Sequence, residues 1–263
     1  MPVLFDHRPG KGVESLHQVL SQNRILPERR KGTSKVTTLQ SFIDLVNRHK
    51  DEDSAIFADT AWPPSLTCVV DYAKADKTAR WHQHRINYAF PATEEITAWI
   101  SGNGKGMEQA AFAQFLEDHA AELADATEEE RKTFEPLFKE RFAAPNELIG
   151  LSRELEVTAT HKVKRGERLQ SGERTVQFSE EHTNGKGEAV ILPGVFMISV
   201  PAFLDGAPVR IPARLRYRIQ GGSIHWSYGL YRAEHWLRNR VKEDMDQAAK
   251  ATALPAFEGA PEA

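Results

Sequence analysis

The sequence has little cysteine and no long hydrophobic run, and both shortages exclude whole classes of protein. A single cysteine among 263 residues excludes an internal disulfide framework and a cysteine-rich zinc site. The longest nearly apolar stretch, residues 194–204, contains Pro201 and is about half of what a membrane-spanning helix needs. The first residues lack the basic region and apolar segment of a secretion signal. We therefore expect a cytoplasmic protein that does not enter a membrane.

The composition is that of a globular protein whose charges are segregated along the chain. Hydrophobic residues make up 40% and charged residues 27%, which excludes a disordered or collagen-like chain. The net charge is only −3, but residues 1–50 carry 9 basic and 4 acidic side chains and residues 51–150 carry 9 and 19. Residues 151–232 carry 12 basic and 8 acidic side chains, and residues 233–263 carry 4 basic and 6 acidic ones. This pattern predicts two electrostatic faces, or subunits that attract one another in an oligomer.

Helical patterns lie mainly in the N-terminal half. A short helix is predicted over residues 13–20, followed by a basic arm or linker over 24–35. Thr37 and Gln40 have the spacing of a capping box and predict a helix from about Thr38 to His49. Further helices are predicted over residues 94–100, 107–123, 128–142, 145–155 and 234–249.

Strand patterns dominate the C-terminal half. Strands are predicted over residues 55–58, 66–72, 80–90, 157–164, 175–181, 190–193, 195–203, 209–219 and 223–232, the second and third as a hairpin. The βα alternation of a doubly wound sheet is missing, so we expect an α+β fold: a largely antiparallel β-sheet with flanking helices, helical in its first half and β-rich in its second. The expected organisation is an arm over 1–36, one domain over 37–251 with a helical sub-region at 94–155 and a β-rich region at 156–232, and a loosely ordered tail over 252–263.

The strongest feature is a strand whose arginines share one parity. Arg210, Arg214, Arg216 and Arg218 alternate with apolar residues, so they should project from one face of the strand. A two-residue turn at Gly221-Gly222 would pair Gln220 with Ser223 and Arg218 with His225. His225 then joins the arginines, while Leu215, Tyr217, Trp226 and Tyr228 pack on the other face.

Two interpretations of this basic face stay open. Arginines at alternate strand positions, roughly 6 to 7 Å apart, could meet phosphates of a nucleic acid. Lys162 and Lys164 share a parity in another predicted strand and would widen the surface if that strand were adjacent. Alternatively, the face is a solvated surface on which glutamates such as those at 154, 156, 167 and 173 pair with the arginines.

Three weaker patterns also allow a functional and a structural interpretation. His82 and His84, with Asp71 on the preceding strand, have a spacing compatible with metal ligands, although alternating histidines on a half-exposed strand more often form a polar surface. The loop Gly102–Gly106 matches neither common phosphate-binding template and is expected to be a flexible connection. Cys68 fits a core position and an inert thiol. No hydrolase or metalloprotease signature occurs, so we predict no catalytic residue and no cofactor.

Several separated motifs occur in order along the chain: Ala89-Phe90-Pro91 with Trp81, His84, Arg85 and Tyr88 before it, Leu151-Ser152-Arg153, Leu192-Pro193-Gly194, Arg214–Arg218 and Leu230-Tyr231-Arg232-Ala233. In these motifs the chain resembles the YfdQ family of proteins encoded by phages and prophages. The resemblance spans about residues 38–255 and implies a phage gene and a product in the bacterial cytoplasm. It supplies no catalytic or binding residues.

Three functions follow as hypotheses. The leading one is a non-enzymatic, oligomeric phage protein that binds nucleic acid, single strands in particular, through the arginine face and the basic N-terminal segment. The second is an interaction module that binds a host protein, for example to inhibit a defence system. The third is a metal-dependent enzyme built on Asp71, His82 and His84.

Overall fold

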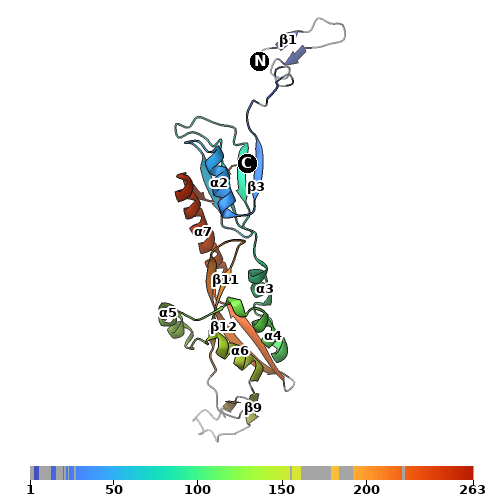
Figure 1. The fold of residues 1–263 in the computed structure, drawn as a ribbon, viewed down its shortest axis with the longest axis vertical. Coiled ribbons are helices and arrows are strands. Elements are labelled where there is room, and N and C mark those ends of the chain that lie inside the picture. Colours follow the sequence, from blue (N-terminus) through green and yellow to red (C-terminus); the bar gives the residue numbers. More distant parts are fainter. Residues whose placement is uncertain are drawn as a thin grey trace, which may run out of the picture. The chain divides into compact units, whose positions relative to one another are not determined.

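The computed structural model describes residues 20, 22, 24–26, 28–154, 192–220 and 223–262, and the short strands at 3–5, 13–15, 156–160 and 179–183. The expected α+β class is confirmed, because helices accompany two five-stranded sheets whose strand pairs, taken together, are mostly antiparallel (Figure 1). By contacts the chain forms two compact units, residues 1–90 with 241–263, and residues 91–240. The single domain expected over 37–251 includes parts of both units.

The first unit is built on the sheet β14-β4-β5-β6-β3. Its central strands β4 (Ala55–Asp59), β5 (Ser65–Val69) and β6 (His84–Tyr88) are antiparallel, which confirms the predicted hairpin. Helix α2 (Leu39–His49) buries Phe42, Ile43 and Val46. Its N-cap is Thr38, one residue after the predicted cap, because the Thr38 hydroxyl accepts the Ser41 N–H.

Both edges of this sheet come from segments predicted to lie outside the domain. β3 (Gly32–Val36) belongs to the expected arm and pairs in parallel with β6. β14 (Ala256–Glu258) belongs to the expected loose tail and pairs in parallel with β4. Both predictions were wrong because these strands are mostly exposed, so backbone hydrogen bonds hold them without the alternating apolar residues that mark a strand in sequence.

The N-terminal helix prediction was also wrong over part of its range. Residues Val13–Ser15 form strand β2, which pairs antiparallel with β1 (Val3–Phe5). The backbone of these residues pairs with β1, so it cannot also form the hydrogen bonds of a helix.

The second unit is built on the antiparallel sheet β7-β13-β12-β11-β8. Its long strands are β11 (Val195–Pro201), β12 (Pro208–Gln220) and β13 (Ser223–Leu230). Short strands β7 (Met107–Glu108) and β8 (Leu123–Ala124) close the edges. Between them the predicted helix 107–123 shortens to α4 (Gln109–Asp118) and the 3-10 turn η1 (Ala120–Glu122), because both ends of the segment pair with the sheet.

Helices cover both faces of the second sheet. Trp99 of α3 (Glu94–Gly102) and Phe112 of α4 contact Tyr228 and Trp226 on one face. On the other face, Phe134 of α5 (Glu128–Phe138) joins a buried cluster with Val195 and Met197. α5 is shorter than the predicted 128–142 helix because Lys139 adopts a left-handed backbone and ends it.

The remaining elements are short or connect the parts already described. Helix α6 (Pro145–Glu154) begins at the predicted proline. Strands β9 (Glu156–Thr160) and β10 (Ser179–Thr183) form an antiparallel pair. Residues 192–193 of the predicted strand 190–193 are not in a strand, and its first two residues lie outside the described residues. Helix α7 (Ala233–Thr252) starts in the second unit and ends in the first. Within the described parts of the chain, no helix is long and apolar enough to cross a membrane.

Candidate nucleic-acid interface

The β12–β13 hairpin has the register predicted from the sequence. Gln220 pairs with Ser223, Arg218 with His225 and Arg216 with Ser227. The hairpin therefore sends two distinct sets of side chains to opposite faces. Leu215, Trp226 and Tyr228 are buried beneath the helices, whereas Arg216 and Arg218 are exposed on the other face.

Arg210 shares the parity of the other arginines but is engaged within the molecule. Its Nε donates to Oε1 of Glu130 at 2.7 Å, and its Nη2 donates to Oε2 at 2.8 Å and to the carbonyl of Asp125 at 2.7 Å. The hydrogen bond from Arg210 is the largest cause of the lowered pKa of the Glu130 carboxyl. Arg210 thus fastens the first turn of α5 to the sheet.

Arg214 lies at the border of the surface that α5 covers. Its guanidinium carbon is 5.5 Å from the ring centroid of Phe138, a cation–π distance, and the side chain is half-buried. Its backbone neighbours are Val195 on β11 and Gly229 on β13. The Arg214 guanidinium therefore contacts an aromatic ring and is still partly exposed to solvent.

Arg216 and Arg218 lie beyond α5, at the exposed end of the hairpin. Within the described part of the chain neither forms an ion pair or a side-chain hydrogen bond. Arg218 lies across from His225, which in turn lies across from exposed Glu108 of β7. We call Arg214, Arg216 and Arg218 the arginine strip; it is narrow because Glu108 bounds one side.

A groove of about 310 Å³ adjoins the strip at Arg216. Its wall includes Glu140, whose side chain packs over Gly194 so closely that a Cβ there would lie 2.5 Å from Glu140 Cγ. Trp226 also lines it, and its buried Nε1 has no hydrogen-bond partner among the residues described. Tyr217 and Trp226 have the strand parity opposite to the arginines, and Trp226 stacks on Phe112 in the core, so the aromatic rings of the hairpin do not lie on the exposed face beside the arginines.

The remaining sequence-predicted members of the basic face are not placed. Lys162 and Lys164 lie outside the described residues, as do Glu167 and Glu173 and the side chains of Glu154 and Glu156. The structure thus brings together Arg214, Arg216, Arg218 and His225.

The suggested metal ligands do not converge. His82 precedes β6 with a left-handed backbone (φ 52°) and stacks on Tyr72, whereas His84 begins the strand, so the two do not alternate on one face. Both carboxylate oxygens of Asp71 accept backbone N–H groups, from Gln83 and His84. No group of three metal-ligating side chains occurs in the described ranges.

The glycine loop and the cysteine have structural roles. Gly104 N–H donates to the Tyr228 carbonyl at 2.8 Å, and Asn103 Oδ1 accepts the Leu230 N–H at 2.9 Å, so the loop is docked on β13. β7 separates it from α4, so the loop does not lead directly into a helix N-terminus. Cys68 is fully buried, and burial raises the pKa of its thiol to about 12.

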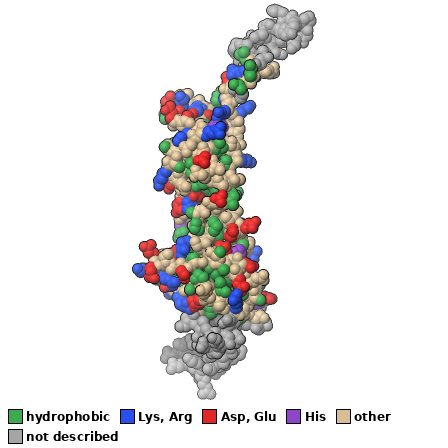
Figure 2. All heavy atoms as spheres, viewed as in Figure 1, with side chains coloured by type: hydrophobic (Ala, Val, Ile, Leu, Met, Phe, Trp, Pro, Cys, Tyr) green, Lys and Arg blue, Asp and Glu red, His purple; other side chains and the backbone are tan. Residues whose placement is uncertain are grey.

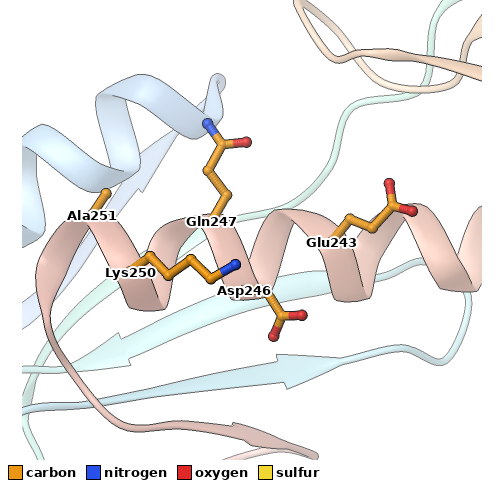
Figure 3. Close-up of a pocket in the computed structure, with 5 residues that line it drawn as sticks. All are labelled: Glu243, Asp246, Gln247, Lys250 and Ala251. Carbon is orange, nitrogen blue, oxygen red and sulfur yellow. The ribbon is translucent and has the colours of Figure 1, made fainter.

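Two further hollows lie in the first unit. One follows the C-terminal half of α7 and is lined by Glu243, Asp246, Gln247, Lys250 and Ala251 (Figure 3). Its side chains carry both signs of charge and diverge along one helix, so they do not form a focused site. The other hollow is lined by Trp81 and by Arg29, Arg30 and Arg80. The sequence does not show that these residues meet, although the basic run before Lys35 was a signal.

A family model matches residues 13–261, almost the whole chain. The chain belongs to a family described as uncharacterized conserved protein (DUF2303). No curated protein and no solved structure matches it. The family description gives no activity and mentions neither YfdQ nor a phage.

Proposed function

We propose that the protein binds nucleic acid through the arginine strip, with single strands as the preferred form. The observation that carries the proposal is the exposure of Arg216 and Arg218 on one sheet face without a carboxylate partner among the described residues. Guanidinium groups bind phosphate oxygens in bidentate geometry, and such contacts do not depend on base sequence.

The dimensions of the surface favour one strand over a duplex. The strip is one β-strand wide, and its arginines are spaced roughly 6 to 7 Å apart along a twisted ribbon. A flexible single strand can follow that path, whereas a rigid duplex would touch it at one point. Since Tyr217 and Trp226 have the strand parity opposite to the arginines, phosphate contacts must supply most of the affinity at this site.

Fluorescence anisotropy with labelled oligothymidine and with a labelled duplex tests the proposal. The wild-type protein is expected to bind oligothymidine at low salt and to bind it more tightly than the duplex. A variant with Arg214, Arg216 and Arg218 changed to Gln should bind at least about tenfold more weakly. An absence of binding at low salt, or equal binding by the variant, would rule the proposal out.

A protein partner is the second candidate, favoured by the outer surface of α5. Leu137 is 56% exposed there, and Glu128 and Glu129 are exposed in the first turn of the same helix. A helix that is acidic in its first turn and exposes an apolar residue near its end fits a partner whose surface carries basic and apolar residues. Leu137→Glu should abolish capture of such a partner from host lysate while leaving oligothymidine binding unchanged.

The resemblance to the YfdQ family supports a wider context for both candidates. We propose a phage- or prophage-encoded protein that acts in the bacterial cytoplasm, where inhibition of a host defence system would be one use of a protein partner. The segregated charges support a homo-oligomer, because an acidic region of one copy can attract a basic region of another. Light scattering that finds a strict monomer would refute the oligomer.

A further inference from the structure

Trp81 presents an exposed aromatic surface next to a cation in the first unit. The side chain lies between β5 and β6 and is 66% exposed. The guanidinium carbon of Arg29 is 3.5 Å from the centroid of its ring, which is a close cation–π contact. The left-handed backbone of His82 lets that ring stack on Tyr72 at 4.9 Å while Trp81 stays at the surface. The loop thus leaves the indole ring of Trp81 exposed to solvent.

A hollow of about 400 Å³ adjoins this ring. It is lined by Arg29, Arg30, Val70, Asp71, Ala79, Arg80, Trp81 and His84. The volume lies in the range of sites for small molecules and cofactors. It suits a ligand of the size of one nucleotide.

Only some of the charged side chains around the hollow have a partner of opposite charge. Arg80 donates to both carboxylate oxygens of Asp51, at 3.1 and 2.6 Å, and the oxygens of Asp71 are occupied by two backbone N–H groups. Arg29 and Arg30, in contrast, pair with no carboxylate in the portion of the chain that is described. Two guanidinium groups are therefore available to an anion.

The histidines beside the hollow respond to its positive charge. Arg30 contacts Nδ1 of His49, and the rings of His49 and His84 are 5.3 Å apart. Burial, followed by the charges of Arg30, His84 and Arg48, lowers the pKa of His49. On the visible face of this unit in Figure 2, Lys and Arg side chains lie among Asp and Glu side chains. An anion bound here would relieve the repulsion between Arg30 and the histidines.

We propose that the Trp81 hollow binds a nucleoside phosphate, either as a free nucleotide or as one unit of a strand. The base stacks on the face of Trp81 that Arg29 does not cover, and the phosphate binds the guanidinium groups of Arg29 and Arg30. This combination of an aromatic ring and a basic groove is what sequence-independent binding of single strands requires, and the arginine strip lacks the exposed ring. The inference deepens the proposed function and rests on it where the nucleotide is part of a strand.

Calorimetric titration of the full-length protein with adenosine 5′-monophosphate tests the site. Trp81→Ala is expected to weaken binding at least about tenfold, because base stacking on an aromatic ring is lost. Trp81→Phe, which keeps a smaller ring, should bind the nucleotide with an affinity between those of the wild type and Trp81→Ala. Arg30→Gln should weaken binding of the nucleotide but leave the weaker binding of adenosine unchanged. Inorganic phosphate alone should bind more weakly than the nucleotide.

Trp62→Ala is the matched control, since Trp62 is another tryptophan of the same unit and is 60% exposed. It should bind the nucleotide like the wild type. Oligothymidine distinguishes the source of the ligand: Trp81-dependent binding of the strand without binding of the mononucleotide assigns the site to strands. The proposal is overturned if neither probe binds, or if Trp81→Ala binds both as the wild type does. The arginine-strip variant should still bind the mononucleotide, so failure of one site is separable from failure of the other.

Discussion

The Arg210 guanidinium is bound to the Glu130 carboxylate by two hydrogen bonds, of 2.7 and 2.8 Å, across 80 residues of sequence. This pair removes one of four same-parity arginines from the exposed face and uses it to hold α5. Near one end of β12, Arg210 is paired with Glu130 of α5. Near the other end, Arg218 is exposed to solvent.

Glu130→Gln should destabilise the second unit because it removes the charge that Arg210 binds. Both side chains are partly exposed, so we expect a loss of about 1–2 kcal/mol in the free energy of unfolding at neutral pH. Urea denaturation followed by circular dichroism measures it. Glu129→Gln, on the exposed side of the same turn, should change the free energy much less.

The contribution of Glu130 should also depend on pH. Its folded-state pKa lies below the ordinary value of 4.5, so the unfolded chain takes up this proton first as pH falls. The stabilisation is complete well above pH 4.5 and is lost as pH falls through the lower, folded-state pKa. The difference in unfolding free energy between wild type and Glu130→Gln should shrink over that interval; a constant difference would contradict the assignment.

Gly102 and Tyr228 should show energetic coupling. A Cβ at Gly102 would lie 2.3 Å from the Tyr228 hydroxyl, which donates to the Trp99 carbonyl at 2.7 Å in the core. Gly102→Ala should destabilise through this overlap, and Tyr228→Phe should cost about 1 kcal/mol through the lost hydrogen bond. The double variant should be more stable than the sum of the two losses predicts, as a double-mutant cycle would show. Additive losses would refute the contact.

Removal of residues 256–263 should open the edge of the first sheet. β14 supplies the parallel neighbour of β4, and the rings of Phe257 and Phe57 are 5.6 Å apart. Hydrogen exchange should accelerate in peptides that cover residues 55–59, while peptides that cover β12 keep their protection. Glu258→Gln, which leaves the backbone ladder intact, serves as the control.

Cys68 should be unreactive in the native protein. Burial raises the pKa of its thiol from 9.0 to about 12, which lowers the thiolate fraction near neutral pH by about a thousandfold. A thiol reagent should label it only after denaturation. Rapid labelling of the folded protein would show that β5 opens or that the strand is placed differently.

The hairpin register was predictable because two independent signals agreed. A Gly-Gly turn set the pairing, and the alternation on both strands set the same buried face. The fold class followed from comparable local patterns. The capture of Arg210 was not predictable, since nothing near Glu130 in sequence indicates that α5 packs on that face.

The edges of the first sheet and the Trp81 hollow escaped prediction for a different reason. β3 and β14 have exposed side chains, so their pairing depends on backbone groups that every residue carries. The hollow requires the Trp81 loop and the arginines before β3 to meet, and that meeting follows from the position of β3 beside β6.

The salt dependence of oligothymidine binding tests the role of the arginine strip most directly. Each phosphate contact in a single strand contributes about 0.7 to the slope of log affinity against log salt concentration, so three arginines contribute about 2. Changing Arg214, Arg216 and Arg218 to Gln should reduce the magnitude of the slope by that amount. Arg210→Gln, which removes the same charge from the same strand, should leave the slope unchanged because Arg210 is bound to Glu130. Equal slopes for the wild type and the triple variant would contradict phosphate binding by the strip.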